Sequence, residues 1–483
     1  MRITRFMVSL LIALFVLDSR IGSAQNVIDN GVTDNLQSRA AKLTRDIPEL
    51  MKLADIPGIS IAVIDEGKVA WTREFGVINA DTKKTVTATS IFEAASLTKV
   101  LVAYATLKFA DAGKIDIDVP LNMYLGNNYD VGDDPRLNQI TTRRVLTHSA
   151  GFPNWRDEGA AVLPINFAPG EKFSYSGEGF VYLSKVLEKI SGKSFIEFMQ
   201  EMVLTPLQMK NSSFVWRDDF DQSGSFRHDQ LGNVAFRNQG TNYNAAASLR
   251  TTAEDYAKFM CALISGTGLK KTTGKEMLKA QIQVDEKFPQ VFWGLGLGLE
   301  VKGNTKEFWH WGDQGFTKAF MIGDLQRKRG VVYFANSANG LSIAKEILAD
   351  AVGGSHPSLV WLDYPGYDAP SRLLLKKIVE KGSKESLETY EANSKQDPSK
   401  VISADEMNSL GYTLMGNKML DDAIAVFERN ALDHPESANV WDSLAEAYMN
   451  QGNKPLAIKY YEKVLQLDST STNAVTQLKK LRE

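Results

Sequence analysis

The chain has few of the residues that build disulfides and metal centres. Its 483 residues include one cysteine, Cys261, and five scattered histidines. A single cysteine excludes an intrachain disulfide, and the apolar pattern of 256–263 predicts a helix in which Cys261 belongs to the core. The histidines form no His-Glu-x-x-His pattern or similar ligand set, so we expect no metal site and no cofactor.

An excess of positive charge is also missing. The formal net charge is −3, and loss of residues 1–24 would change it to −5, because that stretch holds three arginines and Asp18. A mildly acidic protein lacks the basic surface that attracts phosphate backbones. We therefore expect no nucleic acid as a partner.

Long apolar runs are confined to the N-terminus, which has the pattern of a secretory signal. Arg2 and Arg5 precede the apolar run 6–17, and small residues follow as far as Ala24. This order predicts cleavage near Ala24 and export to the periplasm or beyond. An uncleaved anchor is the alternative, but the run is short for a bilayer span. No cysteine stands at the cleavage point, so a lipid anchor is not expected.

Apolar periodicity predicts strands near both ends of a first domain, 25–354, and helices between them. Residues 59–64 and 69–77 are β-rich and are joined by a turn, which predicts a hairpin. Further strands are expected at 292–301, 316–323 and 331–336, and helices at 101–112, 140–147, 181–190, 253–263 and 341–352. This order predicts an α+β fold, with an antiparallel sheet assembled from both ends and flanked by helices, and a large helical insertion.

The pattern changes after Gly354. Residues 355–370 contain three prolines and are expected to form a linker or a strap across the domain surface. In 371–483 small and apolar residues recur 34 positions apart; Ala423 and Phe427, for example, return as Ala457 and Tyr461.

That period is typical of tetratricopeptide (TPR) helix pairs. The pair at 371–398 is degenerate and 470–483 is expected to be a capping helix, so 371–483 is predicted to be an all-α repeat domain that takes a protein partner.

Ser96 and Lys99 stand at the start of the 101–112 helix pattern. Residues three apart share a helix face, so the Lys99 amine can approach the Ser96 hydroxyl. A lysine whose pKa is lowered by burial can take the serine proton and activate the oxygen as a nucleophile. A second match to the same spacing, Ser342 and Lys345, has no partner motifs and is expected to be an ordinary position near a helix start.

Three other segments could meet Ser96. Tyr175 lies in a polar loop, and its phenol could shuttle a proton if a nearby lysine lowers its pKa, although a tyrosine stacked at a turn is the alternative. In 309–316, Gly312 would let a substrate backbone approach, and the Asp313 amide could join that of Ser96 as an oxyanion hole. His310 alone is more often structural. The third segment, 148–153, is expected to be a structural turn.

In this order and spacing the motifs resemble the serine penicillin-recognising enzymes, on the side of the class C β-lactamases, D,D-peptidases and esterases. The resemblance covers residues 45–352 and includes the family-like stretches 146–151, 206–209 and 246–249. It implies a β-lactamase/transpeptidase-like fold and makes Ser96 the acylated nucleophile. It also implies that Lys99 and Tyr175 handle protons and that the Ser96 and Asp313 amides bind the oxyanion.

Two positions depart from the family pattern. Gly177 stands where β-lactamases and peptidases carry an asparagine that would bond a substrate amide. His310 replaces a lysine, which weakens the fixed positive charge for a substrate carboxylate. Both changes favour ester or D-amino-acid peptide hydrolysis over efficient β-lactam hydrolysis.

Two functions therefore remain open. The first is an exported serine hydrolase that acts through an acyl-enzyme on an ester, amide or D-amino-acid peptide and uses its TPR tail to recruit a partner. The second is a catalytically idle ligand-binding protein that works through the TPR module. The intact residues Ser96, Lys99 and Tyr175 favour the first.

Overall fold

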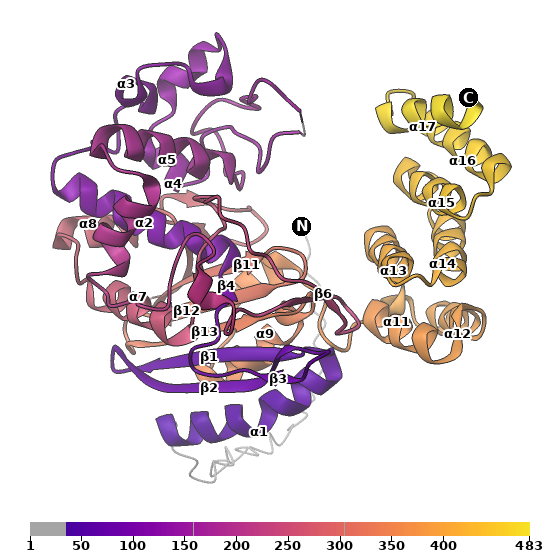
Figure 1. The fold of residues 1–483 in the computed structure, drawn as a ribbon, viewed down its shortest axis with the longest axis horizontal. Helices are drawn as coiled ribbons and strands as arrows, with labels where there is room; N and C mark the ends of the chain where they lie inside the picture. The colour runs from indigo at the N-terminus through magenta and orange to yellow at the C-terminus, as the bar shows by residue number, and fades with distance from the viewer. Residues whose placement is uncertain (1–34, 158, 304) are drawn as a thin grey trace, which may run out of the picture.

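The structure is a computed structural model that describes residues 35–157, 159–303 and 305–483. The predicted secretory signal, residues 1–24, lies outside the described residues. Residues 35–354 form a sheet with helices on both faces, which we call the sheet domain, and 370–482 form a stack of helix pairs, the helical stack (Figure 1). None of the described helices is both long and apolar enough to cross a bilayer.

The main sheet of the described residues has nine strands in the order β3-β2-β1-β13-β12-β11-β10-β9-β8. The strands are β1 (Gly58–Asp65), β2 (Lys68–Asn79), β3 (Lys84–Thr85), β8 (Ile282–Gln283), β9 (Val291–Trp293), β10 (Gly298–Lys302), β11 (Thr305–Asp313), β12 (Lys318–Asp324) and β13 (Arg329–Ala335). Neighbouring strands pair antiparallel, and β1 lies beside β13, with Ile59 opposite Ala335. The prediction of an antiparallel sheet assembled from both ends is confirmed.

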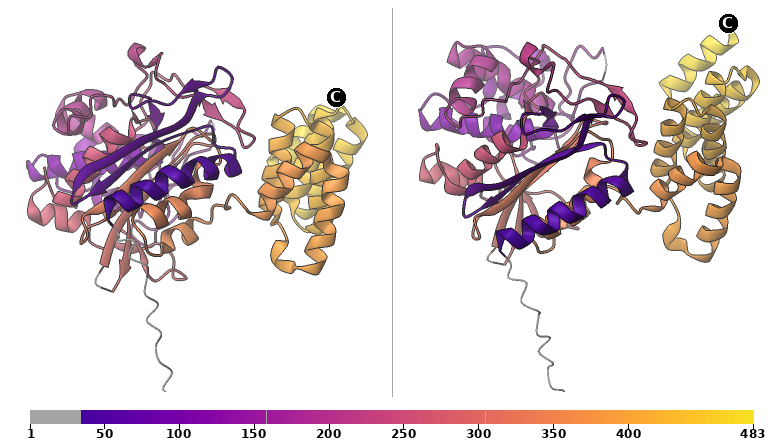
Figure 2. Two further views of the ribbon diagram at one scale, coloured as in Figure 1. Left: turned by 90° about the horizontal axis from the view of Figure 1, so that it is seen from below. Right: turned by 60° about the horizontal axis from the view of Figure 1, so that its bottom comes forward.

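Side chains of β1 alternate between two cores, as the pleat of a strand requires. Ile59, Ile61 and Val63 pack in the core beneath α1 (Leu36–Ala54) and α9 (Ala344–Ala351). Ala62 and Ile64 face the other core, which contains α2 (Thr98–Asp111) and α7 (Ala253–Ser265). Both views in Figure 2 show α1 lying along one face of the sheet.

The helical insertion between β3 and β8 is confirmed. Its further helices are α3 (Leu121–Leu125), α4 (Thr142–Leu146), α5 (Glu178–Ser191), α6 (Phe195–Met199) and α8 (Lys271–Met277). Short strand pairs β4 (Phe92–Glu93) with β7 (Arg250–Thr251), and β5 (Arg227–His228) with β6 (Val234–Phe236), accompany them.

The prediction of a single strand over 292–301 is wrong. The chain turns back between β9 and β10, where the Gly294 amide donates to the Leu297 carbonyl at 2.9 Å. Gly296 has φ +87°, and a Cβ there would lie 2.2 Å from that of Ala103. The glycines serve a hairpin that passes closely over α2, and only glycine accepts that conformation and that contact.

Residues 355–370 form a strap and not a free linker. The strap contains α10 (Pro357–Leu362), and its Trp361 ring lies 5.8 Å from that of Trp309 and 5.9 Å from that of Trp311. Its Tyr364 hydroxyl donates to the Asp313 carboxylate at 2.7 Å. The strap thus contacts the end of β11.

The helical stack consists of α11 (Pro370–Lys381), α12 (Ser383–Gln396), α13 (Ala404–Gly416), α14 (Leu420–Asp433), α15 (Ala438–Asn450), α16 (Lys454–Leu467) and α17 (Thr472–Arg482). At the small-residue position Gly411, a Cβ would lie 2.4 Å from the Phe427 ring. Close helix approach therefore depends on that glycine. Polar side chains join the stack to the sheet domain. Lys376 pairs with Asp55 at 2.9 Å, and Arg372 donates to Asn339.

Candidate active site

Ser96 lies in a 3-10 turn, Ala95–Leu97, at the entry to α2. Ala95 has φ +47°, a strained conformation for a residue with a Cβ, and places the partly exposed Ser96 at the turn. Lys99, in the first turn of α2, is fully buried. Its Nζ lies 3.1 Å from Ser96 Oγ and donates to the Ala246 carbonyl at 2.9 Å. The predicted serine–lysine pair is present.

The surroundings of Lys99 are apolar enough to change its titration. Burial lowers its pKa from 10.5 to about 7, because the ammonium loses its hydration. A substantial fraction of the amine is therefore uncharged at neutral pH and has a lone pair for the Ser96 proton. The second serine–lysine match behaves as expected of an ordinary position, since the buried Ser342 hydroxyl donates to the Asn339 carbonyl at 2.7 Å.

Tyr175 lies beside the pair, but its titration differs from the expectation. Lys99 Nζ stands 4.8 Å from the centre of the Tyr175 ring. Burial raises the pKa of the phenol, and the interaction with Ser96 that opposes this shift is weaker. The expected lowering beside a lysine is wrong for this structure, because Lys99 is itself desolvated. The Tyr175 hydroxyl is buried without a hydrogen bond of ordinary geometry, so a neutral phenol faces the site.

His148, predicted to be only a structural turn residue, holds Tyr175 in place. Its carbonyl accepts from the Ser174 amide at 2.7 Å and its Nδ1 accepts from the Ser176 amide at 3.0 Å. Its ring lies 4.3 Å from the Tyr175 ring at 32°. His148 has φ +53° and is buried, and burial lowers its pKa well below the ordinary value. No local sequence signal links it to residues so far ahead.

His310 on β11 is a second buried, uncharged imidazole. Its Nδ1 lies 2.7 Å from the Trp311 carbonyl, which places the ring proton on Nδ1. Nε2 is then an acceptor, and it has no hydrogen-bond partner among the residues that the structure describes. Burial, helped by Lys99, lowers the pKa of His310 to about 3. A weakened positive charge was expected at this position. At neutral pH, His310 instead carries no positive charge.

Gly312 brings β11 against the nucleophile turn. A Cβ at Gly312 would lie 2.7 Å from the Ala94 carbonyl oxygen and 3.1 Å from the Ala95 Cβ. Glycine is therefore required at 312 because β11 passes so close to the nucleophile turn. The expected reason was a different one, that glycine would let a substrate backbone approach. The predicted juxtaposition of this strand with Ser96 is nevertheless present.

Asp313 ends β11, and its side chain is fully occupied. The carboxylate accepts from the Gly315 amide at 2.8 Å, from the Tyr364 hydroxyl and from Lys318. These contacts hold Asp313 at the end of β11. Gly177, the remaining predicted site residue, precedes α5, and its amide donates to Asn154 Oδ1 at 3.0 Å.

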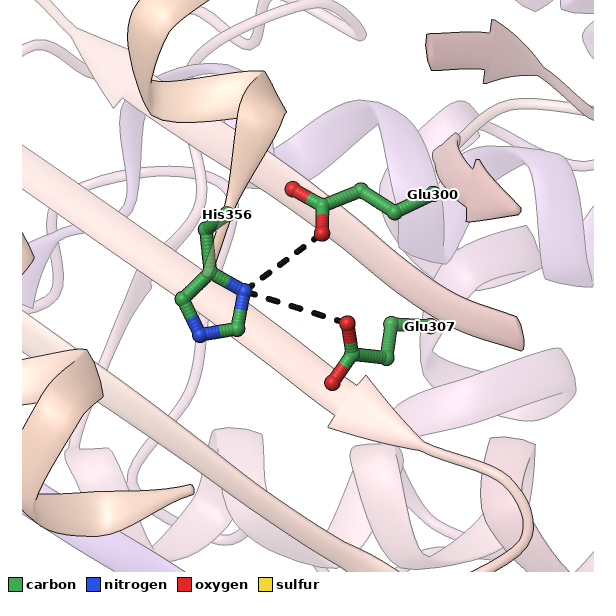
Figure 3. A group of neighbouring side chains, drawn as sticks. All are labelled: Glu300, Glu307 and His356. Carbon is green, nitrogen blue, oxygen red and sulfur yellow. Dashed lines mark ion pairs between the residues drawn. The ribbon is translucent and has the colours of Figure 1, made fainter. Parts of the chain in front are cut away.

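One group of side chains has the composition of a metal site. Glu300, Glu307 and His356 place potential ligand atoms within 4.8 Å of one another, and His356 Nδ1 points between the two carboxylates (Figure 3). However, Lys302 Nζ lies 2.9 Å from Glu300 Oε2 and 2.6 Å from Glu307 Oε2.

The ammonium thus holds the position a cation would take and balances the carboxylates. The Ser358 amide also donates to Glu300 at 3.0 Å. We call these residues the strap anchor, because they fix the start of the strap to β10 and β11.

The chain is similar over part of its length to two relatives. It is 25% identical over 193 residues to protein flp of Staphylococcus aureus strain MW2, which covers 37% of this chain and 38% of that protein. It is 24% identical over 205 residues to esterase EstB of Burkholderia gladioli, covering 37% of this chain and 52% of the esterase. The chain thus spans about half or less of these relatives.

Solved structures and family models extend the similarity. The octameric penicillin-binding protein homologue from Pyrococcus abyssi has a TM-score of 0.57 and 24% identity, over 70% of this chain and 82% of that one, and so shares the fold. A tetratricopeptide repeat model matches residues 438–471. The β-lactamase model matches residues 43–352, more than half of the chain. The chain therefore belongs to the β-lactamase family and carries a C-terminal tetratricopeptide repeat.

Proposed function

We propose that this protein is an exported serine hydrolase that acts through an acyl-enzyme on Ser96. The observation that carries the proposal is the fully buried Lys99, whose Nζ lies 3.1 Å from Ser96 Oγ and whose pKa is lowered to about 7 by burial. A hydroxyl becomes nucleophilic when a base of matched pKa takes its proton. Similarity to an esterase and to penicillin-binding proteins supports the same reaction class.

Acylation follows from the positions of three side chains. Lys99 donates one hydrogen to the Ala246 carbonyl, and its lone pair accepts the Ser96 proton as Oγ attacks the substrate carbonyl. The resulting oxyanion is held by the Ser96 amide, at the positive end of α2, and by the Asp313 amide. When the intermediate collapses, the neutral Tyr175 phenol gives its proton to the leaving group and is reprotonated from Lys99.

Deacylation reverses these transfers with water in place of the leaving group. A water molecule attacks the acyl carbonyl and gives a proton to the Lys99 amine. Lys99 returns a proton to Ser96 Oγ as the acid leaves. The uncharged His310 and the glycine at 177 offer little to a substrate carboxylate or amide. Esters are therefore proposed as better substrates than β-lactams, with D-amino-acid peptides as the second class.

The experiment is active-site labelling combined with a substrate panel. A fluorophosphonate should label Ser96, as mapped by mass spectrometry, and Ser96→Ala should lose both the label and at least ~10³-fold of ester turnover. Ser342→Ala is the matched control and should retain both. The panel compares p-nitrophenyl esters, nitrocefin and D-amino-acid amides on one preparation.

The possible results separate the two functions. A label that survives in Ser96→Ala or maps to Ser342 rejects the assignment. Faster turnover of nitrocefin than of activated esters rejects the substrate order. A chain that takes no label and cleaves no substrate would instead be a ligand-binding protein that works through its helical stack.

The helical stack is proposed to recruit a protein partner. Repeats of this kind present a concave face that takes an extended peptide. In that arrangement, the sheet domain supplies the chemistry and the stack places it near its target.

A further inference from the structure

The indole of Trp155 occupies the space beside Gly177. A Cβ built on Gly177 would lie 2.5 Å from Trp155 Cη2 and 2.8 Å from both Cζ2 and Cζ3. Real side chains do not approach so closely, so any residue other than glycine at 177 would displace the ring. Trp155 remains 45% exposed. The large apolar surface of the indole is therefore open to solvent beside Gly177, which follows Tyr175 by two residues.

The position of this ring is fixed by its neighbours in the chain. The Asn154 carbonyl accepts from the Gly177 amide at 3.0 Å and from the Glu178 amide at 3.1 Å. On the other side, Arg156 pairs with Glu178 at 3.0 Å. Both residues that flank Trp155 are thus bound to the segment that follows Tyr175. The indole is held by the same loop as the phenol, which is what a built binding surface requires.

A second indole, that of Trp311, belongs to β11. The Trp311 ring is 4.8 Å from the Tyr175 ring at 43°, and Trp311 is partly exposed. Trp155 lies against Gly177, two places after Tyr175, and Trp311 contacts Tyr175 itself, so indoles from two elements lie against the 175–177 segment. Aromatic surface of this kind binds apolar groups through burial and ring contacts.

Two cationic side chains near the end of β11 are already paired with carboxylates. Lys318 is paired with Asp313. Arg227, which donates to Gln314, is paired with Glu93 at 2.6 Å. A negatively charged substrate would have to compete with these carboxylates, whereas a neutral one would not.

We propose that Trp155 is a specificity-determining residue that binds the apolar or aromatic acyl group of a neutral ester. The inference rests on the proposed function and names its substrate class. Gly177 is then required because it leaves room for the indole.

The test is a ratio of two substrates, p-nitrophenyl phenylacetate and p-nitrophenyl acetate, measured as kcat/KM. Trp155→Ala should lower the phenylacetate-to-acetate ratio about tenfold, chiefly through KM, because the smaller acyl group makes little contact with the ring. Trp155→Phe should recover most of the ratio. Val162→Ala, which truncates a side chain that is 54% exposed in the same loop region, is the matched control and should leave the ratio unchanged.

A second variant guards against a folding defect in Trp155→Ala. Gly177→Ala leaves the indole intact but forces it to move, and should lower the same ratio. Adding Trp155→Ala to Gly177→Ala should produce no further fall. An equal loss for both esters, or no change in the ratio in either variant, would overturn the inference.

A different result would reject the proposed function itself. If the wild-type chain cleaves neither ester and takes no fluorophosphonate label, the hydrolase assignment fails, and the role of Trp155 fails with it. If the wild type cleaves both esters at an unchanged ratio in every variant, only the role of Trp155 fails.

Discussion

The sheet domain and the helical stack differ in how far apart in the sequence their packed elements lie. In the sheet domain β1 packs against β13, whereas in the stack α15 packs against α16. Around Lys99, the atoms His148 Nε2, Tyr175 Oη and His310 Nε2 are all buried without a hydrogen bond. Such groups are costly, and the surrounding sheet and helices must hold them in place. In the stack, helices contact mainly their neighbours along the chain.

This difference in packing corresponds to a difference in where function lies, buried in the sheet domain and on the surface of the stack. A reactive centre needs polar groups kept from water and from one another, which only long-range packing can enforce. A repeat stack gains stability from successive local contacts, and its function lies on its surface. Perturbations of chemistry should therefore act within the sheet domain, and perturbations of the stack should leave that chemistry unchanged.

The largest expected effect is the pH dependence set by the buried lysine. The pKa of Lys99 is lowered to about 7, so the amine is protonated below that pH and cannot accept the Ser96 proton. Ester kcat/KM should rise with pH and level off above about pH 7.5, with about 100-fold less activity at pH 5. Stopped-flow or initial-rate profiles from pH 5 to 9 measure this. A flat profile over this range would contradict the role of Lys99 as base.

The next effect concerns the residue that positions Tyr175. His148→Ala removes the Nδ1 acceptor and the ring contact and should lower kcat about 30-fold with little change in KM. His148→Asn keeps an acceptor and tolerates the left-handed backbone, so it should recover part of the loss. If both variants show the same kcat defect, the hydrogen bond to Ser176 is not what matters.

A change within the stack should alter stability without altering chemistry. Gly411→Ala places a Cβ 2.4 Å from the Phe427 ring and should destabilise the stack by about 1–3 kcal/mol. In Gly416→Ala the new Cβ has nothing within 4 Å, so this variant is the matched control. Denaturant unfolding followed by circular dichroism reports stability, and ester turnover in native buffer should be equal in both variants. A loss of turnover in Gly411→Ala alone would show that the two regions are coupled.

The smallest expected effect is that of removing the stack while keeping the strap. A chain ending at Ala369 retains Trp361, Tyr364 and the strap anchor. It should keep its rate on p-nitrophenyl acetate within about twofold, because none of the residues assigned to chemistry lies in the stack. A soluble, folded chain that has lost this rate would show that the stack shapes the site.

Features encoded by neighbouring residues were predictable from the sequence, and features made by distant ones were not. Ser96 and Lys99 are three residues apart, so helix geometry alone brings them together. The sheet assembled from both ends also followed from local periodicity. By contrast, the hairpin at Gly296 depends on its approach to Ala103, far away in sequence.

The same limit applies to the surroundings of Tyr175. Its raised pKa results from burial, and burial at that position depends on elements that no local pattern connects. His148 contacts Tyr175, 27 residues further along the chain, and Trp155 contacts Gly177, 22 residues further along. The segment 148–153 was predicted only as a structural turn, because a local pattern does not show which distant side chain an imidazole or an indole will contact.

The strap anchor determines where a different module could be joined to the sheet domain. Lys302, Glu300 and Glu307 belong to the sheet, but the imidazole that faces them comes from His356, beyond the last sheet-domain helix. A recombination point at residue 354 would leave two buried carboxylates with an exposed flank and strip Tyr364 from Asp313. A point at 369 would keep the strap contacts and cut those of the stack, such as the Lys376 pair with Asp55. Any different module joined to this sheet domain should therefore inherit the strap along with the sheet.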